Sequence, residues 1–192
     1  MKHILLTIRP ILGWLAVAVV LAFPVLTLSG AVDMFLRLGE ITGESQDKVH
    51  KEEIDVLSWN WGMSNSGTTH LGPIGGEGKS SVKDLSIIKW IDKATPTIMF
   101  HALTGERIPD ALLTIRKAGG TTPVEYLKID FKDIIVTSAS TGGSGGEDRF
   151  TETITLNFAA FKLTYTPQAP DGTPGTAITL NWDIVDKIGG VK

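Results

Sequence analysis

The sequence contains no cysteine, so neither a disulfide scaffold nor a cysteine-ligated zinc or iron–sulfur site can form. It also lacks an excess of one charge, because 18 basic and 21 acidic residues leave a net charge of −3. Proteins that neutralise phosphates need a basic surface, so a nucleic-acid partner is not expected. The 192 residues suit one domain with an appendage, and 21 glycines and 9 prolines favour many short elements over long helices.

One uncharged run differs from the rest of the chain. Residues 10–32 carry no charge, and as a helix they would reach about 35 Å, enough to cross a bilayer core of about 30 Å. Lys2 and Arg9 precede the run, and Ser29-Gly30-Ala31 suits cleavage by a signal peptidase. We therefore predict a hydrophobic, helical leader at residues 1–30 and a folded domain at residues 31–192.

The nature of this leader stays open between a signal peptide, a membrane anchor and an over-long gene start. Contact with a membrane is expected only through this segment, if it is retained. An apolar helix of this length needs lipid or another apolar helix around it, and we expect the working protein to lack the segment.

The remaining residues alternate between apolar and polar with a period of two, as β-strands do. Ile154, Leu156 and Phe158 share one phase and Phe161 continues on the other, which predicts a bend at Ala159-Ala160. The pattern favours a mainly β sandwich or barrel. Its predicted strands lie near residues 34–38, 54–61, 85–91, 113–115, 127–131, 134–138, 154–158, 161–165 and 178–184.

One helix is predicted after residue 94. Thr95 is expected to cap it, Pro96 suits its first turn and Gly105 ends it. A glycine-containing turn at residues 118–123 predicts a hairpin between two of the strands. Two longer glycine-rich loops, 63–81 and 140–148, exceed hairpin length, which indicates packing against a neighbouring subunit.

No spacing of residues supports catalysis or metal binding. The segment 72–80 ends like a phosphate-binding loop but has Pro73 where its first glycine must stand. His50, His70 and His101 have no partner at metal-ligand spacing, and no nucleophile–base motif occurs. We predict no enzymatic activity, no metal and no cofactor.

The segment Trp59-Asn60-Trp61 combines two large apolar side chains with a polar one. On a strand both indoles share a face, where they bury a large area in a core or at a subunit interface. Asn60 then lies on the other face together with Ser58 and Val56, and we expect this second face to touch another molecule.

Several segments together resemble the haemolysin co-regulated protein (Hcp) family of bacterial type VI secretion. These are AVDMFL at 31–36, GES at 43–45, EIDVLSWNWGMS at 53–64, LTIRKAGG at 113–120, PVEYL at 123–127 and STGGSGGEDR at 140–149. The resemblance implies a two-sheet β-barrel with one short flanking helix, assembled into a hexameric ring. Such rings stack into an inner tube within a contractile sheath, below a spike protein, as in phage tails. The tube carries small effector proteins and is secreted from the cytoplasm through the apparatus.

The resemblance also implies roles for single residues. The position between the two tryptophans faces the ring channel in several relatives, so Asn60, with Ser58, is expected to line the lumen and contact cargo. Trp59 and Trp61 are assigned to a subunit or ring interface.

Ring stacking needs two different ring faces. The hairpin tip at Gly119 and Gly120 is assigned to one of them and Val185 to the opposite one. An alternative reading remains, in which the chain is a membrane-anchored or secreted binding or effector protein with an Hcp-like domain.

Overall fold

The computed structural model describes residues 32–67, 78–117 and 123–192. Within these ranges the chain forms one helix, α1 (Thr95–Thr104), and a series of β-strands. The strands are β1 (Val32–Leu38), β2 (Ile54–Asn60), β3 (Met63–Asn65), β4 (Ser80–Val82), β5 (Leu85–Trp90), β6 (Ile108–Lys117), β7 (Val124–Gly142), β8 (Thr151–Asn157), β9 (Ala160–Tyr165), β10 (Ile178–Asp183) and β11 (Ile188–Val191).

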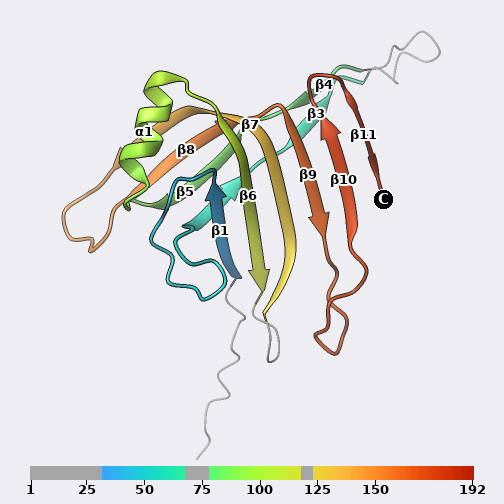
Figure 1. Cartoon of the computed structure of the whole chain (residues 1–192), viewed down its shortest axis with the longest axis horizontal. Coiled ribbons are helices and arrows are strands. Elements are labelled where there is room, and N and C mark those ends of the chain that lie inside the picture. Colours follow the sequence, from blue (N-terminus) through green and yellow to red (C-terminus); the bar gives the residue numbers. More distant parts are fainter. Residues whose placement is uncertain (1–31, 68–77, 118–122) are drawn as a thin grey trace, which may run out of the picture.

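Six antiparallel strands close into a barrel in the order β7-β6-β1-β2-β5-β8, because β8 pairs back onto β7. The predicted β-barrel with one short helix is therefore confirmed. Three further strands, β9, β10 and β11, continue the sheet from the other side of β7; we call them the wing. The wing and α1 lie on opposite sides of the molecule (Figure 1). The short pair β3–β4 forms a separate two-stranded sheet.

The long strand β7 replaces two strands that the sequence predicted separately at 127–131 and 134–138. Its first part pairs with β6 and β9, and its second part, from Ile135 onward, pairs with β8. Asp133, between the two parts, has a left-handed backbone (φ 56°), a conformation that aspartate tolerates better than most residues. The chain bends there without ending the strand, which is why the sequence pattern suggested a break.

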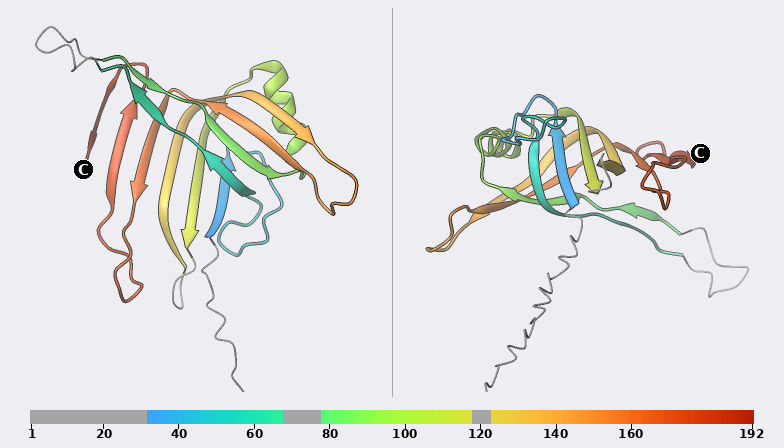
Figure 2. Two further views of the ribbon diagram at one scale, coloured as in Figure 1. Left: turned by 180° about the vertical axis from the view of Figure 1, so that it is seen from behind. Right: turned by 90° about the horizontal axis from the view of Figure 1, so that it is seen from below.

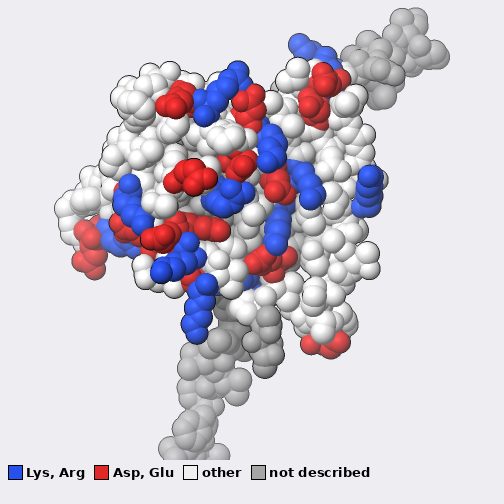
Figure 3. Space-filling view, in the orientation of Figure 1, with Lys and Arg blue, Asp and Glu red and all other residues white. Residues whose placement is uncertain are grey.

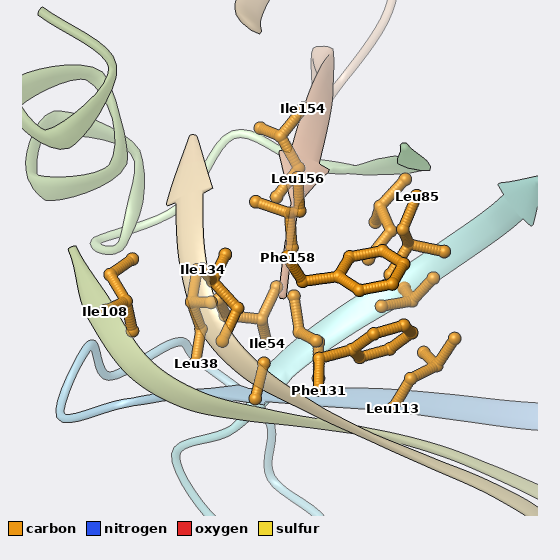
Figure 4. Close-up of a cluster of buried hydrophobic side chains, with 14 of the residues drawn as sticks. Leu38, Ile54, Leu85, Ile108, Leu113, Phe131, Ile134, Ile154, Leu156 and Phe158 are labelled. Carbon is orange, nitrogen blue, oxygen red and sulfur yellow. The ribbon is translucent and has the colours of Figure 1, made fainter. Parts of the chain in front are cut away.

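The predicted bend at Ala159-Ala160 is confirmed, since β8 ends at Asn157 and β9 begins at Ala160. Phe158 and Phe161 both turn inward there, with ring centroids 6.3 Å apart, and Phe131 lies 4.6 Å from Phe158. These rings belong to a single buried cluster of aliphatic and aromatic side chains that fills the barrel (Figure 4). Because the inward-facing side of the chain changes at this bend, the segments before and after it both direct an aromatic side chain into the same core.

Helix α1 begins and ends close to the predicted positions, but Thr95 does not cap it. Ala94 is the capping residue and provides no side-chain hydrogen bond, whereas Gly105 ends the helix with a left-handed backbone (φ 68°) as predicted. The Thr95 hydroxyl instead donates to Glu152 Oε1 (2.8 Å) and accepts the backbone N–H of Asp92. The Thr95 hydroxyl, which the sequence predicted would cap the helix, therefore binds the buried carboxylate of Glu152 on β8.

A fully buried lysine connects this helix to the barrel. Lys89 on β5 points inward, and its Nζ lies 2.6 Å from Glu152 Oε1 and 2.7 Å from Asp92 Oδ1. It also donates to the carbonyl oxygen of Trp90 at 2.7 Å. A charge removed from water must be matched by nearby partners, and these three groups match the ammonium of Lys89.

Substitution of Lys89 by Met should lower the free energy of unfolding by about 3–5 kcal/mol, because two carboxylates would stay buried without their cation. Chemical denaturation of the variant and the wild type measures this loss. Lys83→Met, at an exposed position that precedes β5, should change stability by less than about 0.5 kcal/mol. Equal losses for the two variants would contradict the structural importance of Lys89.

The connection between β1 and β2, residues 39–53, covers part of β1 and β6. Arg116 on β6 donates to Asp47 Oδ2 (2.6 Å) and to Asp33 Oδ2 (2.9 Å), while Asp47 Oδ1 accepts the backbone N–H groups of Val49 and His50. The bond from Arg116 is the main reason why the pKa of Asp47 lies well below its ordinary value, although burial opposes the shift. The same bond is the main cause that raises the pKa of Arg116.

Because folding lowers the pKa of Asp47, its stabilising contribution should be complete above about pH 4 and should disappear as the pH falls toward the lowered value. Asp47→Asn should therefore destabilise the protein by about 1–3 kcal/mol at neutral pH, with a difference that narrows in acid. Unfolding measured between about pH 7 and pH 2 tests this expectation. Asp148→Asn, at an exposed position, should follow the wild type throughout.

Candidate functional site: the hydroxyl face of the barrel

Four barrel strands, β2, β5, β8 and the second part of β7, present a common outer face of small polar side chains. Strand register aligns Asn60 with Ser86, Ser86 with Thr155, and Thr155 with Ser138. At a strand spacing of about 4.8 Å, this row spans about 14 Å. A second row beside it runs through Ser58, Ile88, Thr153 and Ser140. We call these eight residues the hydroxyl face.

The hydroxyl face contains no charged residue and one apolar side chain, Ile88, which is 38% exposed. Ser58 and Asn60 are exposed, as the sequence predicted for both. Charged groups occur at its margins: Asp84 accepts hydrogen bonds from Thr137 and Asn157, and Arg149 lies 5.0 Å above the ring of Trp90. The face can therefore offer hydroxyl and amide groups to a neighbour without selecting for its charge.

The opposite sheet has a different outer surface. Basic and acidic side chains alternate over β1, β6, β7 and β9 (Figure 3). Arg37 contacts Asp110 at 2.6 Å, and Lys132 lies 3.9 Å from the same carboxyl group. The barrel therefore has one outer face of paired charges and one of uncharged hydroxyl groups.

A bulge in β2 decides which of its residues reach the hydroxyl face. Val56 pairs with Lys89, but the next pair is Ser58 with Ile88, so Leu57 is an extra residue. The prediction that Val56 shares a face with Asn60 is therefore wrong. Val56 points into the core and is 6% exposed, because the bulge changes the phase of the alternation.

Trp59 of β2 and Trp61, which directly follows β2, both pack toward the inside of the barrel, on one face as their spacing predicted. Trp59 pairs with the buried Ile87, and both indoles pack against the core cluster. Trp61 meets Phe161 edge to face with ring centroids 4.7 Å apart, and its Nε1 donates to the carbonyl oxygen of Lys83. Both side chains thus contribute to their own barrel, and their assignment to a subunit or ring interface stays a prediction.

An apolar groove of about 370 Å³ lies between the β3–β4 pair and the wing. Its apolar walls come from Met63, Val82, Phe161, Leu180 and Trp182. The wing also exposes large apolar side chains beyond the groove, notably Tyr165, Ile178, Ile188 and Val191. Neither the β3–β4 pair nor β11 was predicted, because segments this short show no clear alternation.

The sequence analysis also assigned Val185, Gly119 and Gly120 to contacts between stacked rings. Val185 lies in the turn between β10 and β11, 74% exposed, rather than on a strand. Gly119 and Gly120 lie outside the described residues, as do the leader at 1–30 and His70. β6 and β7, which flank the predicted hairpin turn, pair in antiparallel fashion as expected.

The described residues offer no group of three or more histidine, aspartate or glutamate side chains suited to a metal ion. The Nδ1 of His101 contacts the carbonyl oxygen of Glu106. Across residues 32–67, 78–117 and 123–192, no helix is long and apolar enough to span a membrane.

Sequence reasoning identified Ser58 and Asn60 but missed the other six members of the hydroxyl face. The alternation of Thr153 and Thr155 with buried Ile154 was a usable signal for an outward polar face on β8. The sequence pattern, however, does not show that β5 lies beside β2 and β8 beside β5, so the two rows could not be predicted from it.

Comparison with known proteins agrees with this architecture. The profile of the family described as "Type VI secretion system effector, Hcp" matches residues 35–165. Protein hcp1 of Pseudomonas aeruginosa is 56% identical over 155 residues, which cover 80% of this chain and 96% of that protein.

Solved structures of Hcp proteins share the fold. Hcp1 from Salmonella typhimurium is 35% identical with a TM-score of 0.68, and the match covers 83% of this chain and 99% of that one. The structure of a type six secretion system protein is 30% identical with a TM-score of 0.78, covering 83% and 100%. These relatives support the predicted role as a tube subunit of type VI secretion. The chain belongs to the Hcp family of type VI secretion proteins.

Proposed function

We propose that this tube subunit works as a closed ring of six copies, with the hydroxyl face lining the channel. Rings would stack into a tube inside a sheath and below a spike protein, and small effector proteins would travel in the channel. The main observation that supports this proposal is the uncharged outer face of four strands. Asn60 and Ser58 belong to this face, at the positions predicted to face the lumen. Weak, adaptable hydrogen bonds to such a face would hold different cargoes without trapping them.

The wing supports ring formation, because it exposes apolar side chains that a solitary subunit would leave in water. Ile178 is 51% exposed, Val191 is 68% exposed, and both belong to the sheet extension beyond the closed barrel. A ring of identical chains needs two different surfaces that fit each other and close after a fixed rotation. We infer that the wing is one of these surfaces and packs against the barrel of the next subunit.

The other assignments complete this proposal. Residues 1–30 are a leader that is separate from the domain at 31–192. Gly119, Gly120 and Val185 contribute to the contacts between stacked rings, and Trp59 and Trp61 lie near the interface. The role is structural, and none of its steps requires catalysis.

Sedimentation or light scattering of residues 31–192 should give six times the mass of one subunit. Ile178→Asp together with Val191→Asp should raise the dissociation constant of the ring by at least about tenfold, since carboxylates would be buried in an apolar contact. Val49→Asp provides a matched control, because Val49 is 72% exposed on the β1–β2 connection and lies outside the wing. A wild-type protein that stays monomeric at high concentration would contradict the ring.

The lining of the channel can be tested separately. Asn60→Trp should leave the ring intact and reduce co-purification of small effector proteins by at least about tenfold, because six copies narrow one channel together. Lys132→Trp, on the charged outer face, should retain cargo as the wild type does. Loss of the ring itself in Asn60→Trp would place Asn60 at a subunit contact and refute the channel assignment.

A further inference from the structure

Helix α1 exposes a row of apolar side chains on its outer side. Pro96, Phe100 and Leu103 lie at positions i, i+4 and i+7, which share one stripe of a helix. Phe100 is 55% exposed and Leu103 is 87% exposed. We call these three residues the α1 face. A surface helix normally directs charged side chains outward, but Thr95–Thr104 contains no Asp, Glu, Lys or Arg, and the surface over α1 is mostly uncharged (Figure 3).

The barrel holds this helix in one position. Ala94 and Ile98 are fully buried on its inner side, and the Thr95 hydroxyl donates to Glu152 Oε1 at 2.8 Å. At the other end, the Gly105 N–H donates to the carbonyl oxygen of His101 at 2.9 Å. Because α1 is already fixed, its outer side chains lose little conformational entropy when a neighbour covers them.

The groove between the β3–β4 pair and the wing is a second uncovered apolar surface. Leu180 and Trp182 of β10 form one wall, and Met63 and Val82 of the β3–β4 pair form the other. Of the described residues that line the groove, none is charged. Its volume of about 370 Å³ lies at the small end of the range of about 300–1,000 Å³ over which pockets hold ligands. The groove therefore has room for one or two large side chains.

The α1 face and the groove lie on opposite sides of the subunit, so they cannot meet within one chain. In Figure 1, α1 is at the upper left, whereas the β3–β4 pair and the end of β10 are at the upper right; the reverse view in Figure 2 shows the same separation. A ring of identical chains needs two different surfaces that fit each other. One surface projects and the other is hollow, and contact between them buries no unpaired charge.

We propose that the α1 face of one subunit docks into the groove of the next subunit around the ring. Phe100 and Leu103 enter between the β3–β4 pair and β10 of the neighbour, where they cover the apolar side chains of both walls. The inference rests on the ring proposed above and supplies the surface that meets the wing. Each subunit thus uses its helix on one side and its groove on the other, and the repeated contact closes the ring.

Acidic substitutions on either surface test the contact, with the mass of the full chain followed by sedimentation. Leu103→Asp on the α1 face and Met63→Asp in the groove should each raise the dissociation constant of the ring by at least about tenfold, because each buries a carboxylate in an apolar contact. Both positions are exposed in the single subunit, so thermal unfolding of the dissociated variants should match that of the wild type. Val49→Asp, on the exposed β1–β2 connection, is the matched control and should leave the dissociation constant unchanged.

A mixture of the two variants shows whether the two surfaces form one contact. A Leu103→Asp subunit keeps an intact groove, and a Met63→Asp subunit keeps an intact α1 face, so one sound contact can form between them. The two variants should therefore associate with each other with a dissociation constant at least about tenfold lower than that of either variant alone. Equal dissociation constants for the mixture and for the separate variants would overturn the pairing of the α1 face with the groove.

These measurements separate the contact from ring formation itself. A wild-type protein that stays monomeric at high concentration contradicts the ring and the contact together. In the other case the wild type forms a ring that Ile178→Asp with Val191→Asp dissociates, whereas Leu103→Asp leaves its dissociation constant within about twofold of the wild-type value. That result overturns the α1 contact and leaves the ring in place.

Discussion

The structure depends on the double pairing of β7. This one strand pairs with β6 and β9 in its first part and with β8 in its second, so it belongs to the barrel and to the wing together. Without the pairing of β7 with β8, the barrel strands would form an open sheet with exposed edges. Figure 2 shows how the wing continues the same sheet outside the closed barrel. Pairing of β7 with β8 thus encloses the core and creates the hydroxyl face, and pairing of β7 with β9 begins the wing.

Barrel closure forces each strand to serve two surfaces, because successive side chains point to opposite sides. On β8, Ile154 and Leu156 are buried in the core, while Thr153 and Thr155 lie on the hydroxyl face. The inner residues therefore stabilise the barrel, and the outer ones form the surface that we propose lines a channel. The hydroxyl face can therefore change in sequence while the core stays intact.

Two clusters of charged groups attach the irregular parts of the chain to this barrel. Lys89, with Glu152 and Asp92, connects the start of α1 to β5 and β8. On another side, Arg116 and His50 hold the β1–β2 connection through carboxylates from the connection and from β1 and β7. Both irregular segments are thus attached to the barrel by side chains that lie far apart in the chain.

The sequence by itself determined the β class, the helix with its Gly105 end, the bend near Ala159 and the membership of the Hcp family, because alternation and local motifs are properties of neighbouring residues. It also placed Asn60 and Ser58 on an exposed face. Only the tertiary structure decided that Val56 turns inward, that Thr95 binds Glu152 and that Ser86, Ser138 and Thr155 join Asn60 in one row. These outcomes depend on a bulge, a buried charge and strand neighbours, which arise from contacts between residues far apart in the chain.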